Sequence, residues 1–304
     1  MRVAFTAAVE KALLSDPDSL LITGDLGYNA FEGLASRLGP RFLNAGVAEQ
    51  NMMGVAAGTA LAGFRPWVYS IAPFATLRCL EQIRNDICLH DLPVRIVGNG
   101  GGYTYGVMGS THHALEDLAC LKALPNMTLY FPCADDQVKA AVVMISGEKG
   151  PTYLRLAISG FPSSRPPLAE NPATLTRTYH LGGGATIVAV GHAVQIALSA
   201  LETSDSPLQD ADVFGLAKFP FDLKSDSSLL KSVEKTQRVV VVEEHYQNGG
   251  VGESLKAALP GVERFDILGA KYFRAQRYGG AAFHLKQSGL SPEDLAERVR
   301  SALR

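Results

Sequence analysis

The chain has 304 residues, of which 47% are hydrophobic and 19% are charged, and its formal net charge at pH 7 is −2. A chain of this length and composition can form one large or two medium domains with a sizeable core. The balanced charge and the lack of a long basic run argue against nucleic acid or an anionic membrane as a partner.

Cysteine spacing and the apolar runs predict a cytoplasmic protein. The four cysteines form no C-x-x-C pair and are typical of small buried residues in a reducing compartment. The first 19 residues do not look like a signal peptide, because Glu10 and Lys11 interrupt the apolar run. The uncharged stretch 181–201 has the length of a membrane span, but Gly191, His192 and Gln195 divide it into a strand and a helix.

Short β-rich apolar runs alternate with helical stretches in the first half of the chain. Strands are predicted over residues 19–24, 65–72, 92–101 and 127–132. Helices are predicted after Glu49, over 77–90 and after the histidine pair at 112–113. This alternation predicts a mostly parallel sheet covered by helices.

Composition changes over residues 159–180, where four prolines and several polar residues predict a linker. A second α/β unit follows, with strands predicted over 185–192, 211–217 and 238–245. Ser291 and Asp294 fit the capping box of a final amphipathic helix. We therefore predict two consecutive α/β domains with mostly parallel sheets, covering residues 1–165 and 178–304.

A carboxylate at the start of an apolar segment raises the first functional question. Glu49 precedes an uncharged run from Met52 to Phe64 that is rich in Ala, Gly and Met. Glu49 can be an acid that favours the positive end of a helix dipole. It can also be a buried acid held for catalysis, and the spacing alone leaves both interpretations open.

Further candidates lie where predicted strands end. Asp25 stands where open α/β sheets bind ligands, although it can equally cap a turn or a helix. The glycines of 98–106 do not form a dinucleotide fingerprint, but they allow the backbone to approach a ligand closely. His112 and His113 do not share a helix face, so a metal site formed by both is not expected. One of them can point into a cleft as a donor or proton carrier, or both can be capping or surface residues.

Glu243, Glu244 and His245 end another predicted strand, before a Gly-Gly turn that opens a helix. Turn formation and close packing explain the glycines most simply. A catalytic pair at this place is the alternative.

Five stretches together resemble the C-terminal half of a transketolase, and more closely the second chain of a split transketolase. They are NAGVAEQNMMGVAAGTALAG, LEQIRND, THHALEDLACLKALPNM, PCADD and VVVVEEHYQNGGVGESL. Their order and spacing match over roughly residues 3–300. The family fold that this resemblance implies is a pyrimidine-binding α/β domain followed by a smaller C-terminal α/β domain.

The resemblance implies a catalytic role for Glu49. Gly46-Val47-Ala48-Glu49 matches the family motif G-[IV]-x-E, which assigns Val47 and Glu49 to cofactor binding. In that family the glutamate holds the aminopyrimidine of thiamine diphosphate at a ring nitrogen. Proton sharing there lets the cofactor lose the proton of its thiazolium carbon and become a nucleophile.

Similarity assigns further residues to the site. Phe74 is expected to stack on the pyrimidine, with Ile71 and Leu77 at places where related enzymes usually carry aromatic residues. Asp25 matches an acid near the cofactor. His112 matches a histidine that faces the substrate, and it is expected to donate to a substrate hydroxyl or to the developing oxyanion.

The resemblance also implies a partner chain. Thiamine enzymes carry G-D-G and a later Asn that bind magnesium and the diphosphate, whereas this sequence has Gly24-Asp25-Leu26. Thiamine diphosphate is therefore expected at an interface with an N-terminal transketolase subunit that holds the diphosphate and magnesium. We expect no metal ligand in this chain and an assembly of two copies of each chain.

Three departures from the family concern the substrate. Sugar-phosphate transketolases carry an acid where Met108 stands, a phosphate-binding arginine where Ile158 falls and often a histidine where Gly100 stands. Loss of these groups predicts an acceptor unlike the usual pentose phosphates, such as a nucleotide-linked or otherwise modified sugar. Arg155 is expected to be a structural strand residue, and Arg165 or a partner residue can restore phosphate binding.

The expected activity is transfer of a two-carbon ketol unit from a ketose to an aldehyde or ketone acceptor. One alternative is the beta chain of a 2-oxo acid dehydrogenase or an acyloin-type enzyme, and a less favoured one is half of a deoxyxylulose-phosphate synthase. The non-enzyme alternative is an inert chain that stabilises or regulates an active partner. Retention of Glu49, Phe74 and His112 argues against an inert chain.

Overall fold

The first domain is built around a seven-stranded sheet with the order β11-β5-β6-β4-β3-β1-β2. All neighbouring strands are parallel except β11 and β5. The computed structural model describes residues 1–158, 165–203, 205–272 and 278–304. The strands of this sheet are β1 (Ser19–Thr23), β2 (Phe42–Asn44), β3 (Arg65–Ile71), β4 (Arg95–Asn99), β5 (Thr128–Tyr130), β6 (Thr152–Leu156) and β11 (Lys218–Phe219).

The helices of this domain follow the predicted alternation. They are α1 (Arg2–Ser15), α2 (Glu32–Leu38), α3 (Glu49–Leu61), α4 (Ala72–Ala75), α5 (Leu80–Gln82), α6 (Asp117–Lys122) and α7 (Asp135–Gly147). Short helical turns are η1 (Gly39–Arg41), η2 (Leu77–Cys79), η3 (Ile83–Cys88) and η4 (Gly106–Met108). The single helix predicted over 77–90 is therefore η2, α5 and η3 in succession, and η3 is π-helical.

The second domain contains a six-stranded sheet with the order β13-β12-β9-β10-β8-β7. Its four strands from β13 to β10 are parallel, whereas β8 and β7 run antiparallel to their neighbours. The strands are β7 (Ala169–Asn171), β8 (Thr176–His180), β9 (Ala185–Val190), β10 (Ala211–Leu216), β12 (Arg238–Tyr246) and β13 (Arg264–Ala270). The helices and helical turns are η5 (Gly191–Ala193), α8 (Val194–Leu201), η6 (Pro207–Asp210), η7 (Leu223–Ser225), α9 (Ser227–Thr236), α10 (Val251–Ala258), α11 (Ala281–Gln287) and α12 (Pro292–Leu303).

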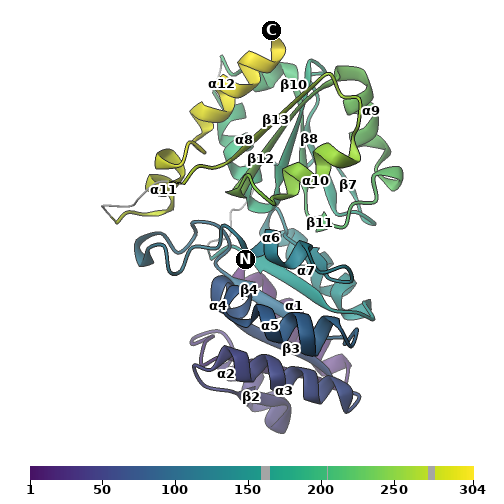
Figure 1. Cartoon of the computed structure of the whole chain (residues 1–304), viewed down its shortest axis with the longest axis vertical. Helices are drawn as coiled ribbons and strands as arrows, with labels where there is room; N and C mark the ends of the chain where they lie inside the picture. Colours follow the sequence, from purple (N-terminus) through teal and green to yellow (C-terminus); the bar gives the residue numbers. More distant parts are fainter. Residues whose placement is uncertain (159–164, 204, 273–277) are drawn as a thin grey trace.

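The two sheets confirm the predicted α/β fold with mostly parallel strands, and the domains lie one above the other in Figure 1. The stretch 181–201 divides into β9, η5 and α8, as predicted. Within the described parts of the chain, none of the helices combines the length and hydrophobicity that crossing a bilayer requires. The cytoplasmic location stays a prediction.

The predicted linker over 159–180 is too long, because β7 and β8 lie inside it and pair with the second sheet. The prolines predict a linker where β8 (Thr176–His180) forms, although its β-branched residues favour extended structure. Residues 159–164 of this segment lie outside the described residues. The domain bounds 1–165 and 178–304 stay a prediction.

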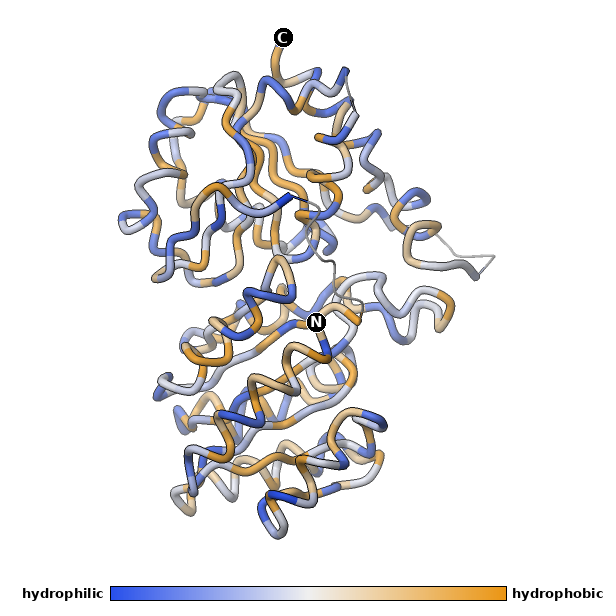
Figure 2. The backbone as a smooth tube through the Cα atoms, turned by 180° about the vertical axis from the view of Figure 1, so that it is seen from behind, coloured by the Kyte–Doolittle hydropathy of each residue, from blue (hydrophilic) through white to orange (hydrophobic). Residues whose placement is uncertain are grey.

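The core consists of two apolar layers that each continue through both domains. Along β1, Leu21 packs with the layer beneath α1 and α7, and Leu20 and Ile22 pack with the layer beneath α3. This alternation follows from the two-residue period of a strand. The strand tubes in Figure 2 are correspondingly orange at the centre of each domain. The four consecutive valines of β12 are fully buried, as a central parallel strand requires.

The second domain also completes the first sheet. β11 follows β10 in the chain, yet it pairs antiparallel with β5. The Phe131 amide donates to the Ala217 carbonyl at 2.9 Å beside this pair. The two domains therefore share main-chain hydrogen bonds as well as core layers.

A buried polar network joins the domains behind the glycine loop. The Arg155 Nε donates to Asp117 at 2.9 Å, and another guanidinium nitrogen of Arg155 donates to the main-chain carbonyl of Glu244 at 3.0 Å. The Glu244 carboxylate contacts His192 and accepts from the Tyr103 amide. Burial opposes ionisation of Glu244, but the adjacent His192 leaves its pKa below the usual value.

The remaining acids at this strand end also have structural roles. Glu243 accepts hydrogen bonds from the amides of Val251 and Gly252, which begin α10. His245 accepts from the Ala119 amide at 3.2 Å, and its pKa is lowered by burial. These contacts favour the structural interpretation of residues 243–245 over a catalytic pair.

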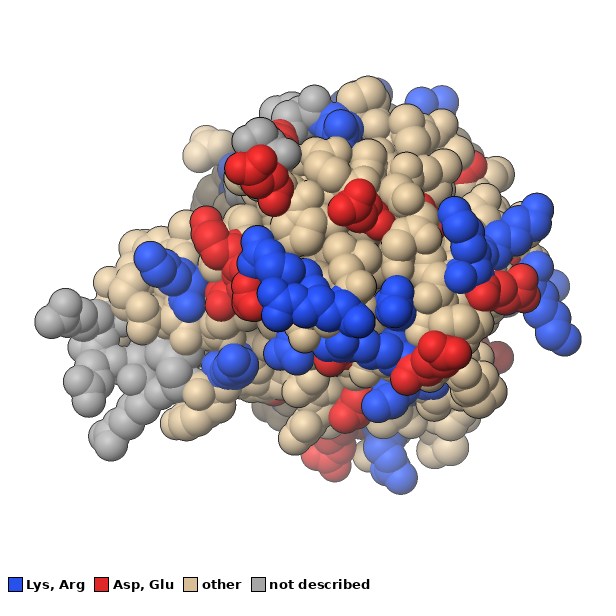
Figure 3. Space-filling view, turned by 90° about the horizontal axis from the view of Figure 1, so that it is seen from above, with Lys and Arg blue, Asp and Glu red and all other residues tan. Residues whose placement is uncertain are grey.

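Charged side chains at the far end of the second domain carry both signs. Lys and Arg gather near the centre of this end, with Asp and Glu among them (Figure 3). Arg264 and Arg298 both pair with Asp266, and Arg300 pairs with Glu297. Several of the described basic side chains at this end are therefore neutralised by neighbouring acids.

Replacement of Arg155 by Met tests the buried network. Asp117 would remain buried without its cation, so we expect Arg155→Met to lower the free energy of unfolding by about 3–5 kcal/mol in urea titrations. Arg37→Met is the matched control, because Arg37 pairs with Glu10 at the surface, where a pair contributes about 1 kcal/mol or less. If both variants lost the same small amount of unfolding free energy, the buried network would not stabilise the fold as expected.

Glu243 predicts a specific pH dependence of stability. Burial raises its pKa to about 7. The folded chain therefore keeps a proton on Glu243 that the unfolded chain releases near pH 4.5, so this contribution to stability is present below pH 4.5 and is lost as pH rises through 7. Between pH 4.5 and 7.5, we expect the free energy of unfolding of wild type to fall by roughly 3 kcal/mol relative to that of Glu243→Gln. Parallel stability curves for the two proteins would rule this out.

Candidate active site

Glu49 is the first residue of α3 and is also buried, with only 2% of its surface exposed. The preceding turn uses Gly46 at a φ of 72°, a conformation that glycine adopts without strain. The Ser70 hydroxyl donates to the Oε1 atom of Glu49 at 3.1 Å. An Arg78 guanidinium nitrogen lies 2.6 Å from Oε2. The acid is thus both at a helix start and buried, and its catalytic role stays a prediction.

Phe74 lies beside this carboxylate on the short helix α4. The Arg78 guanidinium carbon stands 4.3 Å from the centroid of the Phe74 ring. The His112 ring meets Phe74 edge-to-face, with centroids 5.1 Å apart. Ile71 is the buried last residue of β3, and its expected place against the pyrimidine stays a prediction. The structure therefore brings Glu49, Phe74 and His112 into one cluster.

Asp25 lies at the neighbouring strand end and is tied to the motif turn through Asn44. The Asn44 amide donates to Asp25 at 2.9 Å, and its side-chain oxygen accepts from the amides of Asp25 and Gly46. Hydrogen bonds from Asn44 and from the Tyr28 hydroxyl lower the pKa of Asp25. Asp25 is therefore held as a carboxylate at the rim, whereas Val47 is 75% exposed on the turn itself.

The glycine loop brings Tyr105 toward His112, with ring centroids 5.7 Å apart. Asn99 donates to the Tyr105 hydroxyl at 3.2 Å. Gly100 has a φ of 86°, and a Cβ atom at this position would collide with the Tyr105 ring. Met108, on η4, is about half exposed. Gly100, Met108 and His112 thus belong to one loop region, in which Tyr105 fills the space beside Gly100.

His113 takes a different direction from His112. It is buried with its ring edge-to-face against the rings of both Tyr103 and His284, and its Nε2 atom lies 3.1 Å from the Gly106 carbonyl. Burial lowers the pKa of His113. The two histidines therefore do not act together, and His113 supports the loop from behind.

Exposed apolar side chains surround the cluster. They follow the carboxyl ends of β1, β2, β3 and β4, and they are Tyr28, Val47, Leu77, Val107 and Met108. Because these strands are parallel, their carboxyl ends share one edge of the sheet. An exposed apolar rim of this kind is typical of a surface that another molecule covers.

Four residues of the cluster were missed by sequence reasoning: Ser70, Arg78, Asn44 and Tyr105. Asn44 stands two residues before Gly46, where a polar side chain can close a turn, so the sequence carried a weak signal for it. Ser70 and Tyr105 carried no local signal, because their contacts cross between strands and loops. Arg78 lies in the stretch 77–90, whose pattern is typical of an ordinary amphipathic helix, so it did not stand out.

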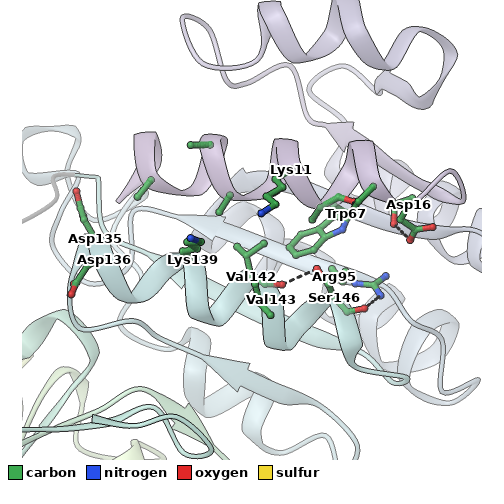
Figure 4. A pocket seen from close by; sticks show the side chains of 16 residues that line it. Lys11, Asp16, Trp67, Arg95, Asp135, Asp136, Lys139, Val142, Val143 and Ser146 are labelled. Carbon is green, nitrogen blue, oxygen red and sulfur yellow. Dashed lines mark hydrogen bonds between the residues drawn. The ribbon is translucent and has the colours of Figure 1, made fainter. Parts of the chain in front are cut away.

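A large groove of about 810 Å³ lies elsewhere, between α1 and α7 (Figure 4). Alanines of α1 and the side chains of Lys11, Lys139 and Val143 line it. Its buried Arg95 already donates to three main-chain carbonyl oxygens. None of the predicted cofactor or substrate residues lines this groove, so its size does not make it the active site.

Metal-binding groups do not converge at the cluster. Among residues 1–158, 165–203, 205–272 and 278–304, no group of three or more His, Cys, Asp or Glu side chains is placed to hold a metal ion. Asp25 has the Asn44 amide and the Tyr28 hydroxyl as neighbours instead. The polar atoms of the cluster are suited to hydrogen bonding with an organic ligand.

Comparison with known proteins gives the family. The pyrimidine-binding domain of transketolase matches residues 1–159, and the transketolase C-terminal domain matches residues 177–286. An apulose-4-phosphate transketolase subunit of Phocaeicola vulgatus is 31% identical over 83% of this chain and 80% of its own length. A 6-deoxy-6-sulfo-D-fructose transketolase subunit of a Clostridium species is 35% identical over 72% of this chain and 67% of its own length.

A solved structure agrees with this assignment. A split-gene transketolase, described as an inactive beta4 tetramer, superposes with a TM-score of 0.83 at 30% identity. The superposition covers 99% of this chain and 96% of the other. These matches confirm the resemblance predicted from the sequence motifs, and the family implies dependence on thiamine diphosphate. The chain therefore belongs to the transketolase family, of which it carries the pyrimidine-binding and C-terminal domains.

Proposed function

We propose that this chain is the pyrimidine-binding subunit of a thiamine diphosphate-dependent transketolase. The reaction transfers a two-carbon ketol unit from a ketose donor to an aldehyde or ketone acceptor. The observation that carries the proposal is the buried Glu49 carboxylate, fixed by Ser70 and linked through Arg78 to Phe74, whose ring His112 contacts edge-to-face.

The contacts of Arg78 indicate that an aminopyrimidine fits this site. Its guanidinium is a planar group with N–H donors, and it lies over Phe74 while it donates to Glu49. An aminopyrimidine is likewise planar, and its ring nitrogen can share a proton with a carboxylate. Because Phe74 and Glu49 accept the guanidinium, the site also has the shape and polarity to accept an aminopyrimidine.

Each residue of the cluster has a distinct task in this proposal. Glu49 holds a proton at its Oε2 atom against a pyrimidine ring nitrogen, and Ser70 fixes the other carboxylate oxygen. Phe74 sets the plane of the ring. His112 donates to the oxygen of the substrate carbonyl, where negative charge develops. The cofactor, when bound, supplies the carbon nucleophile.

A partner chain completes the site. The exposed apolar rim leaves the cluster open on one side, and this sequence lacks the G-D-G motif for magnesium and diphosphate. The names of two relatives describe them as subunits, and the solved beta4 tetramer is described as inactive. We propose an N-terminal transketolase subunit as the partner, with two copies of each chain and with magnesium held by the partner.

Glu49→Gln tests the catalytic assignment in the co-purified pair of chains. Gln keeps the shape and can accept from Ser70, but it cannot exchange a proton with the cofactor. We expect ketol transfer to fall by a factor of at least about 100 in kcat. Glu81→Gln, an exposed acid on α5, is the matched control and should retain wild-type activity.

Calorimetric titration tests the role of the partner chain separately from the assigned reaction. Thiamine diphosphate with magnesium should bind the pair and not the lone chain. Tight binding to the lone chain would reveal a diphosphate site that this proposal lacks. An unchanged kcat in Glu49→Gln, or turnover of 2-oxo acids in preference to ketoses, would reject the transketolase assignment.

The substrate end of the site supports an unusual acceptor. Met108 and Ile158 stand where the family resemblance places an acid and a phosphate-binding arginine, and Tyr105 fills the space beside Gly100. Arg155 does not substitute for that arginine, because it is buried against Asp117. The relatives named for apulose 4-phosphate and 6-deoxy-6-sulfo-D-fructose indicate that sugar substrates vary within this family.

A substrate panel tests this specificity. We expect a nucleotide-linked or otherwise modified sugar to give a higher kcat/KM as acceptor than ribose 5-phosphate, by roughly tenfold or more, because a missing charged contact costs above 1 kcal/mol. Steady-state rates of the assembled pair with a fixed ketose donor give the comparison. Ribose 5-phosphate as the best acceptor would disprove the expected specificity.

A further inference from the structure

Arg78 reaches the carboxylate from the open side of the site. It lies on η2, one turn after Phe74, and its side chain is 43% exposed, whereas that of Glu49 is 2% exposed. The guanidinium contacts the Phe74 ring face and the Oε2 atom of Glu49 at once. The same side chain therefore covers both groups that the proposed function assigns to the pyrimidine.

Two planar groups cannot occupy this place together. Oε2 of Glu49 lies 2.6 Å from the guanidinium, so a ring nitrogen that takes the same oxygen displaces it. The Phe74 face is covered at 4.3 Å, which is the separation of stacked groups. Entry of the pyrimidine thus requires Arg78 to leave.

We propose that Arg78 is a placeholder that occupies the pyrimidine site of the cofactor-free chain and sets the affinity for thiamine diphosphate. This inference rests on the proposed function. In the cofactor-free chain, Arg78 supplies the cation that an enclosed carboxylate needs. Because Arg78 is partly exposed, it can rotate into solvent on a long flexible side chain without burying its own charge.

The placeholder makes cofactor binding competitive with an internal ion pair. Only the fraction of chains with Arg78 turned away can bind the pyrimidine, and the apparent affinity falls by that fraction. Arg78 acts on the cofactor through Glu49 and Phe74, so it is a positioning residue and not a catalytic one. Its removal should tighten cofactor binding, which is the opposite of what loss of a binding residue does.

The experiment compares Arg78→Met with Arg84→Met in the co-purified pair of chains. Met keeps much of the length and removes the charge and the donors. Arg84 is exposed on η3 and contacts Asn85, so it controls for loss of a positive charge. We expect thiamine diphosphate with magnesium to bind Arg78→Met about fivefold more tightly than wild type in calorimetry, and Arg84→Met to bind as wild type does.

A second measurement uses the lone chain and needs no cofactor. Thermal unfolding of wild type, Arg78→Met, Glu49→Gln and the double variant forms a double-mutant cycle. We expect Arg78→Met to lower Tm and Glu49→Gln to remove most of that loss, because neutral Gln needs no cation. Arg78→Lys should retain most of the coupling.

The outcomes separate the two proposals. In one outcome, the wild-type pair binds thiamine diphosphate and the Arg78→Met pair binds it no more tightly. That result overturns the placeholder and leaves the proposed function intact. Independent Tm effects of Arg78 and Glu49 also overturn the placeholder. Absence of thiamine diphosphate binding in the wild-type pair overturns the proposed function itself.

Discussion

An enclosed carboxylate must have partners, and the arrangement of the first domain follows from supplying them to Glu49. Ser70 reaches it from β3, and Arg78 reaches it from the irregular segment after α4. The parallel pairing of β1 with β3 brings the strand ends close enough for these contacts. Arg78 lies on η2, the first of the three short elements into which the predicted helix over 77–90 divides.

Much of the fold and part of the site could be predicted from the sequence. Alternating apolar runs indicate parallel strands, and Glu49, Phe74 and His112 lie in motifs that resemble the family locally. Long-range geometry carried no such signal. Arg78 meets Glu49 across 29 residues and Tyr105 meets Gly100 only through a folded loop, so a linear pattern cannot reveal them. The predicted linker was too long because the prediction gave more weight to the prolines than to the β-branched residues of β8.

The exposed apolar residues around the cluster would favour assembly with the partner proposed above. A carboxylate, an aromatic ring and a histidine at a sheet edge would lose much of their electrostatic effect in open water. Tyr28, Val47 and Val107 stay exposed around them in the single chain. Covering this rim would bury apolar surface and exclude water in the same step, so association and the creation of a dry site would share one driving force.

The second domain contributes to the site through the loop that carries Tyr105. The Tyr103 amide donates to the Glu244 carboxylate, and a Cβ atom at Gly102 would collide with that carboxylate. His113 holds the other end of the loop through the Gly106 carbonyl. Glu244 is in turn held by His192 and Arg155. The loop between Tyr103 and His112 is therefore fixed at both ends by buried groups, and Glu244 and His192 of the second domain help to fix its first end.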